Sequence, residues 1–285
     1  MGSLGLKILN LLSTAQLSGY CIQFIYVNLL LKPEFMETDQ LKTMRIGVRA
    51  FILGLCFTSG SVLAQTLPLP RNLINFNSTE GEELLLASKA RKDYWSLSTQ
   101  FVTQTNQAYC GVASIVMVLN ALSIPAPLAP EYSPYHVFTQ ENFFNNEQTQ
   151  KVLSPKVVSR QGMTLGQLGQ LLGSYPVKVK VYHASETSLE EFRSSVVANL
   201  KQPSNFVLVN YLRRRIGQEK GGHISPVAAY NEQTDRFLIL DVSRYKYPPI
   251  WVKAADLWQA MATMDSVSGK TRGFVTVSQD QFISR

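Results

Sequence analysis

The feature that most constrains the fold is a change of pattern near residue 201. Before it, apolar residues recur at helical spacing in residues 80–101, 111–122, 163–175 and 188–201. After it, runs rich in β-branched and aromatic residues alternate with turn sequences, as in 205–214, 223–231 and 236–243, followed by a helix at 254–264 and a last strand at 272–278. This order predicts an α+β chain, with helices and an antiparallel sheet as two layers and a cleft between them.

The segment from Met44 has the pattern of a secretory leader. Two arginines precede an apolar stretch at 51–57, and the small residues Val62 and Ala64 stand at the −3 and −1 positions before Gln65. Residues 44–64 are therefore predicted to be a signal peptide, and the mature chain is predicted to be exported to the periplasm or another extracytoplasmic space. An uncleaved anchor is the alternative, and a chain that does not use the leader would be cytoplasmic.

Residues 1–43 precede this leader, although signal peptides rarely begin so deep in a chain. One interpretation is an over-extended start, with Met44 the true first residue; the other is an additional membrane segment. We favour the first, which makes 65–285 the single folded domain.

The charge of this domain excludes one class of function. The whole chain carries a formal net charge of +7, and the leader contributes only a few of its basic residues. No basic stripe interleaved with aromatic residues is present, so nucleic-acid binding has little support. The densest charge run, "YLRRRIGQEK" at 211–220, is expected to be a solvated loop or strand edge.

Cys110 is the one cysteine that remains after the leader, since the other two are at positions 21 and 56. It stands where a helix is expected to begin, and the partial positive charge of a helix N-terminus favours a thiolate and lowers the thiol pKa. A lone cysteine can also be a small buried apolar residue. A catalytic role therefore needs a base and an orienting group elsewhere in the chain.

The chain offers three histidines as the base, and His223 fits best. It opens a β-run after two glycines that allow close approach of another chain, whereas His136 lies in a proline-rich loop and His183 at a strand end. Asp241 ends an apolar strand 18 residues later, and a hairpin would bring its carboxylate beside the imidazole.

The oxyanion of an acyl transfer needs hydrogen-bond donors, of which the N–H of Cys110 is one. The side-chain amide of Gln104, six residues earlier, is the preferred second donor, with Gln107 as the competitor. The order Gln, Cys, His, Asp, with a helix after the cysteine and strands around the other two, is typical of papain-like cysteine enzymes. Each residue alone also has a purely structural interpretation.

At these residues the chain resembles the phytochelatin synthase family. The likeness rests on "QTNQAYCGVASIVMVLNALSI", "GGHISPVAAYN", "LILDVSRYKYPPIWV" and "GKTRGFVTVS", in that order, and covers roughly Leu67 to Ser284. The resemblance implies a papain-like fold and γ-glutamylcysteine transfer. The cysteine thiolate attacks the Cys-Gly bond of glutathione and glycine leaves, after which the acyl group passes to water or to a second glutathione.

The resemblance also implies roles for individual residues. Cys110 would be the nucleophile, His223 the acid and base, Asp241 the orienting group and Gln104 the oxyanion donor. Substrate-binding residues would be Arg272, near the γ-glutamyl carboxylate, with Gly222 and with Asp265 holding the arginine. No residue is assigned to a metal.

The chain departs from plant members of the family, which carry further cysteines and a cysteine-rich C-terminal region. It is similar to the short, prokaryote-type members, which tend toward hydrolysis. With no bound cofactor expected, cadmium or zinc would arrive as a glutathione thiolate complex. A general papain-like peptidase and a non-enzymatic heavy-metal-binding protein are the alternatives. The expected partner is glutathione, with no nucleic acid and no membrane for the mature form; a homodimer stays open.

Overall fold

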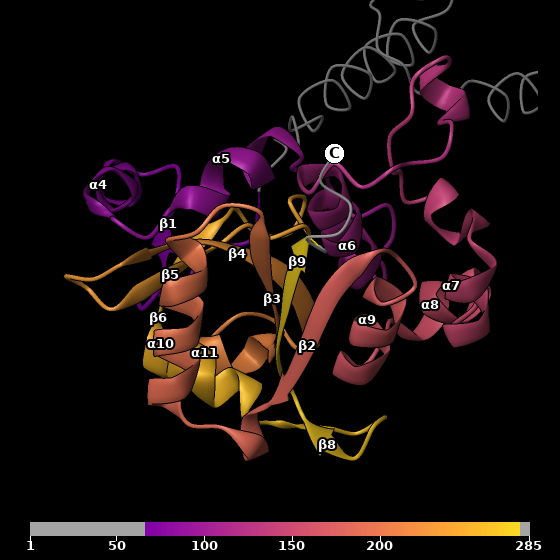
Figure 1. Ribbon diagram of the computed structural model, residues 1–285. Helices are drawn as coiled ribbons and strands as arrows, with labels where there is room; N and C mark the ends of the chain where they lie inside the picture. The colour runs from indigo at the N-terminus through magenta and orange to yellow at the C-terminus, as the bar shows by residue number, and fades with distance from the viewer. Residues whose placement is uncertain (1–65, 280–285) are drawn as a thin grey trace, which may run out of the picture. The chain divides into compact units, whose positions relative to one another are not determined.

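A seven-stranded antiparallel sheet organises the part of the chain that the computed structural model describes, residues 66–279 (Figure 1). The strand order is β1-β6-β5-β4-β3-β9-β2, and β7 and β8 form a separate hairpin. The predicted leader and the segment before it, 44–64 and 1–43, lie outside the described residues. The strands are β1 (Ile74–Asn75), β2 (Val177–His183), β3 (Asn205–Leu212), β4 (Gly222–Asn231), β5 (Arg236–Ile239), β6 (Ile250–Lys253), β7 (Met264–Asp265), β8 (Lys270–Thr271) and β9 (Gly273–Gln279).

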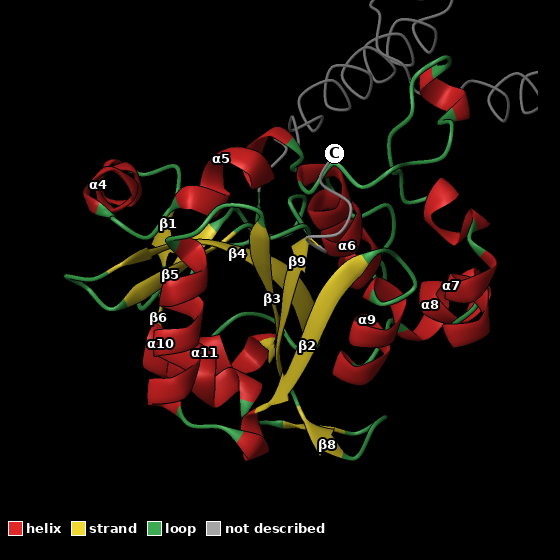
Figure 2. Ribbon diagram, viewed as in Figure 1, coloured by secondary structure: helices red, strands yellow, loops and turns green. Residues whose placement is uncertain are grey.

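Helices lie on both faces of this sheet (Figure 2). They are α4 (Thr79–Ala87), α5 (Lys92–Thr99), α6 (Cys110–Ala121), α7 (Glu147–Val152), α8 (Pro155–Gln161), α9 (Leu165–Leu172), α10 (Leu189–Leu200) and α11 (Ala254–Met261). The α+β class is therefore confirmed. The expectation of two layers is wrong, because α10 and α11 cover the second face of the sheet and add a third layer.

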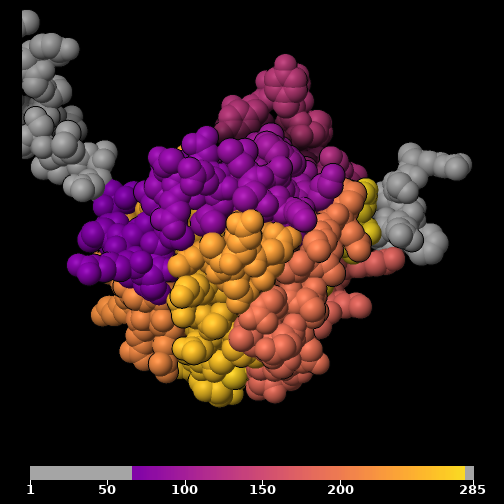
Figure 3. Space-filling view, turned by 90° about the vertical axis from the view of Figure 1, so that its left-hand side faces the viewer, coloured from indigo at the N-terminus to yellow at the C-terminus, as the bar shows by residue number. Residues whose placement is uncertain are grey.

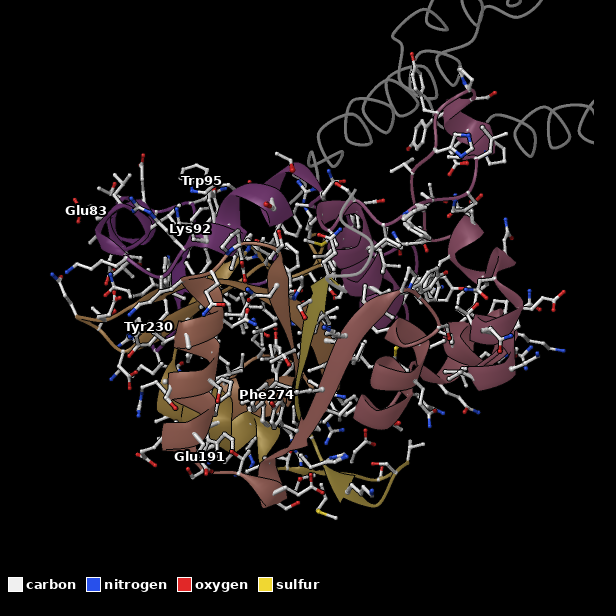
Figure 4. All side chains as sticks on the ribbon, in the orientation of Figure 1. Glu83, Lys92, Trp95, Glu191, Tyr230 and Phe274 are labelled. Carbon is white, nitrogen blue, oxygen red and sulfur yellow. The ribbon has the colours of Figure 1, made fainter. Side chains whose placement is uncertain are left out.

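Strand β3 shows why the sheet needs both helical layers. Phe206 and Leu208 belong to the apolar cluster that includes α6 and α9, whereas Val207 and Val209 belong to the cluster that includes α10 and α11. Successive side chains of a strand point to opposite faces, so a strand apolar at every position must be covered on both sides. Figure 4 shows Phe274 of β9 among the side chains between the sheet and α10, where its ring centroid lies 5.2 Å from that of Phe192.

The local helix signals hold with one exception. Ser188 caps α10 and forms the expected reciprocal pair with Glu191, and Thr164 caps α9 in the same way. The helical pattern at 80–101 instead forms two helices, α4 and α5. The chain breaks at 88–91 because the Ala90 carbonyl accepts a hydrogen bond from Tyr230 N of β4, at 2.8 Å, and joins the edge of that strand.

The proline-rich segment forms a loop with a short 3-10 turn at Pro130–Tyr132. It projects from the body of the molecule as the magenta segment of Figure 3, and Tyr132 and Tyr135 are exposed there. Within residues 66–279, no helix combines the length and apolar character that a membrane crossing requires.

Candidate active site

Cys110 is the first residue of α6 and its side chain is buried. The glycine after it allows the loop before α9 to pack here, since a Cβ at Gly111 would lie 2.4 Å from Met163 Sδ. The Ser114 hydroxyl lies 2.8 Å from the Cys110 carbonyl oxygen and 3.2 Å from that of Ile224. The start of the helix is thereby joined to the start of β4, where the candidate base lies.

The charge state of the Cys110 thiol differs from the sequence-based expectation. Burial raises its pKa above the ordinary value, while backbone hydrogen bonds from Ile224 and Gly111 and the charge of Arg213 act in the opposite direction. The helix N-terminus thus favours the thiolate as expected, but the loss of solvation outweighs it. The expected net lowering is wrong for the protein without substrate.

His223 and Asp241 lie together as the hairpin prediction required. Strands β4 and β5 are antiparallel, and Asp241 follows β5 by two residues. The His223 Nε2 atom lies 2.9 Å from Asp241 Oδ1, and both side chains are almost fully buried. The T-shaped contact of the imidazole with the Tyr211 ring, at 5.7 Å between centroids, further restricts its orientation.

The hydrogen bonds of the pair identify the nitrogen that can act as base. Ionic and hydrogen-bonding partners hold the pKa of Asp241 below its usual range despite its burial, so the carboxylate can only accept a hydrogen bond. Nε2 of His223 must therefore carry the proton. Nδ1 makes no hydrogen bond among the described residues, so this nitrogen is available to accept a proton.

Arg213 is a functional-site residue that the sequence interpretation missed. It was expected in a solvated charge run, yet it is buried and binds Asp241 through two bonds, Nη1 to Oδ2 at 2.7 Å and Nη2 to Oδ1 at 2.9 Å. Its neighbours Arg214 and Arg215 are exposed as expected. A 3-10 turn closed at Gly217, with φ 83°, directs Arg213 inward, a geometry that the charge pattern does not encode.

The same arginine affects the base. Burial, and then the positive charge of Arg213, lower the pKa of His223 to about 4, although Asp241 acts to raise it. The resting site at neutral pH is thus a neutral thiol beside a neutral imidazole.

The two candidate oxyanion donors occupy different places. Gln104 is buried: its Nε2 donates to the Asn106 carbonyl at 2.7 Å and to Tyr245 Oη at 3.1 Å, and its Oε1 accepts from Ser243 Oγ at 2.7 Å. Gln107 lines the cavity that contains Cys110, whereas Gln104 does not. The preference for Gln104 stays a prediction, and it requires the amide to exchange one of these bonds when substrate binds.

Arg272, Asp265 and Gly222 come together on the sheet side of the cavity. The Arg272 guanidinium donates from Nη1 to the Met264 carbonyl at 2.6 Å, and its Nη2 lies 3.8 Å from Asp265 Oδ1. Gly222 allows this position, because a Cβ there would lie 3.2 Å from Nη2. Burial lowers the pKa of Arg272, and its buried Nε has no hydrogen-bond partner among the described residues. The Arg272 guanidinium therefore has N–H donors that are available to bind a carboxylate.

A cavity of about 470 Å³ contains this chemistry, with Cys110 and His223 in its wall. Asn210 of β3 also lines it and was not singled out from the sequence; its side chain is buried and shares the α6 face of the strand. A larger cavity, of about 610 Å³, lies between β2, β9 and α10, but no cysteine, histidine or carboxylate lines it. The smaller cavity is therefore the candidate active site.

The remaining histidines lie elsewhere, as expected. His136 Nδ1 bonds to the Ala126 carbonyl in the projecting loop, and His183 Nδ1 bonds to that of Thr271. Across residues 66–279, no group of three or more His, Cys, Asp or Glu residues is arranged to hold a metal ion.

Comparison with known proteins agrees with this geometry. A family model described as phytochelatin synthase matches residues 64–274. Glutathione gamma-glutamylcysteinyltransferase 3 of Lotus japonicus is 34% identical over 78% of this chain and 45% of its own length. The corresponding enzyme 1 of Arabidopsis thaliana is 34% identical over 77% of this chain and 44% of its own.

The chain thus spans less than half the length of these curated relatives. Among solved structures, xylellain, a cysteine protease from Xylella fastidiosa, aligns with 73% of this chain and 92% of its own at 10% identity and a TM-score of 0.39. The match of the family model over most of the chain, with Cys110, His223 and Asp241 gathered at one site, shows that this chain belongs to the phytochelatin synthase family.

Proposed function

We propose that this protein is a glutathione γ-glutamylcysteinyltransferase and hydrolase. The observation that carries the proposal is the cavity wall shared by Cys110 and His223, with the imidazole held 2.9 Å from the Asp241 carboxylate. The names of the curated relatives support glutathione as the substrate and γ-glutamylcysteine as the group transferred.

In the first half-reaction the Cys110 sulfur attacks the carbonyl carbon between the cysteine and glycine of glutathione, and Nδ1 of His223 takes the thiol proton. The backbone N–H of Cys110 donates to the oxyanion, because the first residue of a helix has no intrahelical acceptor for its own N–H. Asp241 stabilises the imidazolium that forms. The imidazolium then protonates the glycine nitrogen, the C–N bond breaks, and a thioester to γ-glutamylcysteine remains.

In the second half-reaction a nucleophile attacks the thioester. Nδ1 of His223 removes its proton and later returns a proton to the Cys110 sulfur. Water yields γ-glutamylcysteine, and the amine of a second glutathione yields the two-repeat peptide. The same groups serve both halves, since each proton that His223 takes is given back within that half-reaction.

The test is the mass spectrum of products after purified protein is mixed with glutathione. Free glycine and γ-glutamylcysteine should appear, and neither should form with Cys110→Ala. The matched substrate is the isomer in which glutamate is joined through its α-carboxyl group. Equal cleavage of both peptides would show a general peptidase instead, and an alanine variant that still releases glycine would exclude Cys110 as the nucleophile.

Cadmium or zinc is proposed to enter as a glutathione thiolate complex rather than at a site on the protein. Thiophilic ions need thiolate ligands, and residues 66–279 contain a single cysteine, Cys110. Equilibrium dialysis of protein whose Cys110 has been alkylated, without glutathione, should find no stoichiometric tight cadmium binding. A stoichiometric site under those conditions would support a dedicated metal sensor.

Export of the mature chain is proposed from the leader pattern at 44–64. N-terminal sequencing of the protein from its native host should give Gln65 as the first residue. A mature protein that begins upstream of Met44 would contradict both the leader and the over-extended start.

A further inference from the structure

The candidate active site contains a second arginine besides Arg272. Of the described residues that line the cavity, two are cationic, Arg272 on the sheet side and Arg160 on the helical side. Arg160 belongs to the last turn of α8. No sequence motif pointed to it, and nothing in the mechanism above uses it.

The chain around Arg160 runs close to the nucleophile. Gly162, two residues on, adopts φ 70°, and a Cβ there would lie 3.5 Å from the Ala108 carbonyl oxygen. Met163, the next residue, packs against Gly111 directly after Cys110. Arg160 itself lines the same cavity as Cys110, and its guanidinium has the planar fork of donors that suits a carboxylate.

Arg160 also has no competing partner. It is exposed, and its guanidinium makes no hydrogen bond or ion pair with any of residues 66–279. Arg272 differs, because a backbone carbonyl and a hydroxyl hold its Nη1 and a carboxylate lies beside its Nη2. Arg160 is therefore the cation of the cavity whose donors are all available to a ligand.

Glutathione presents two carboxylates, one on either side of the bond that breaks. If the γ-glutamyl carboxylate lies at Arg272, the glycine carboxylate lies toward the opposite end of the cavity. We propose that Arg160 binds this second carboxylate and is a specificity-determining residue for the leaving amino acid. The inference rests on the proposed function, because it takes glutathione as the donor.

The same subsite must also serve the acceptor. The departing glycine is an amine with a carboxylate on the adjacent carbon, and the γ-glutamyl end of an incoming glutathione has the same arrangement. Because the new amide forms where the old one broke, the two amines occupy one position and their carboxylates share one partner. Arg160 thus selects α-amino acids and peptides with a free α-amino acid head over simple amines as acceptors.

The experiment combines substitution of Arg160 with removal of the carboxylate from the substrate. Glutathione and its glycinamide analogue, which lacks the glycine charge, are compared as donors for the full chain and for Arg160→Gln and Arg160→Lys. The full chain should prefer glutathione by at least about tenfold in kcat/KM, the usual size of one charge-assisted contact. Arg160→Gln should lower kcat/KM for glutathione by about that factor and should change kcat/KM for the analogue little. Arg160→Lys should keep part of the preference for glutathione.

Lys156→Gln is the matched control, since Lys156 is exposed on the same helix but does not line the cavity. It should behave as the unsubstituted protein. The rate at which iodoacetamide alkylates Cys110 should be the same in all variants, because this neutral reagent has no carboxylate to bind. A second measurement follows labelled glycine into glutathione during turnover; Arg160→Gln should reduce this exchange relative to hydrolysis.

The outcomes separate the two proposals. The assignment of Arg160 would be overturned if Arg160→Gln still preferred glutathione over the analogue. It would also be overturned if kcat/KM fell equally for both donors. Failure of the unsubstituted protein to release any glycine from glutathione would instead overturn the proposed function itself.

Discussion

The chemistry of single residues in this site depends on burial more than on sequence neighbours. Cys110, His223, Asp241 and Arg213 are each less than a tenth exposed. At such positions the neutral form of a group gains over the charged form unless a partner compensates. Asp241 has Arg213 and His223 as partners and stays ionised, whereas the thiol and the imidazole are held neutral.

The thiol of Cys110 should therefore be protonated at neutral pH in the substrate-free protein. Thiolate absorbance near 240 nm should be low at pH 7 and rise only above the range where an ordinary cysteine ionises. Cys110→Ala supplies the baseline without this thiol. A thiolate signal that is already complete at pH 6 would show a preformed ion pair with His223 and contradict the neutral resting state.

Replacement of Arg213 by glutamine should raise the pKa of His223. The arginine charge disfavours the imidazolium, so its loss should move the NMR titration midpoint of His223 from about 4 toward or above its ordinary value. Removal of one partner of a buried ion pair should also lower the free energy of unfolding by about 3–5 kcal/mol. Arg214→Gln, at the exposed neighbour, is the control and should change neither quantity.

At the scale of one element, α9 contains two glycines with opposite roles. A Cβ at Gly166 would meet nothing within 4 Å, whereas a Cβ at Gly169 would lie 2.3 Å from Val181 Cγ2 of strand β2. The sequence pattern predicts the helix, but helix propensity assigns the same unfavourable free energy to both glycines. They differ because the helix approaches the edge strand β2 closely at Gly169 and not at Gly166.

Gly166→Ala should stabilise the protein by about 0.5–1 kcal/mol, because alanine loses less backbone entropy than glycine in a helix. Gly169→Ala should destabilise it by about 1 kcal/mol, since the branched side chain of Val181, although exposed, must shift away from the new methyl group. Urea unfolding of the two variants gives the comparison. Equal effects of the same sign would show that helix propensity alone, and not packing on β2, determines stability here.

At the scale of the whole molecule, one buried carboxyl makes stability depend on pH. Asp93 of α5 is almost fully buried, and neither of its oxygens has a hydrogen-bond partner among the described residues. Burial raises its pKa to about 9. In the unfolded chain the same group ionises near pH 4 (an ordinary aspartate, about 3.9), so between these values the folded state holds a proton that the unfolded state has lost.

The contribution of Asp93 to stability is thus greatest below about pH 4 and falls as pH rises toward 9, by up to about 1.4 kcal/mol per pH unit. Asp93→Asn should remove this slope, so that the variant gains in thermal midpoint relative to the unsubstituted protein between pH 5 and pH 8. Glu83→Gln, at an exposed position visible on the outer side of α4 in Figure 4, should leave the slope unchanged. Parallel curves for Asp93→Asn and the parent would contradict a buried neutral carboxyl.

The local pattern of the sequence determined the elements and part of the site. The helix after Cys110, the capping pair of Ser188 and Glu191, and the hairpin that carries Asp241 back toward His223 all follow from neighbours within about 20 residues. Periodicity, capping and turn chemistry act at that range. For this reason the amino-acid sequence alone predicts the fold class and the pairing of His223 with Asp241.

Only the tertiary structure decided the rest. Arg213 meets Asp241 across 28 residues, strand β9 enters the sheet between β3 and β2, and Arg160 lines the cavity from a helix with no sequence motif. The sign of the change in the Cys110 pKa likewise depends on how much surrounding chain excludes water. Burial and the pairing of distant strands are properties of the assembled chain, because each depends on which segments pack together and not on the order of residues within one segment.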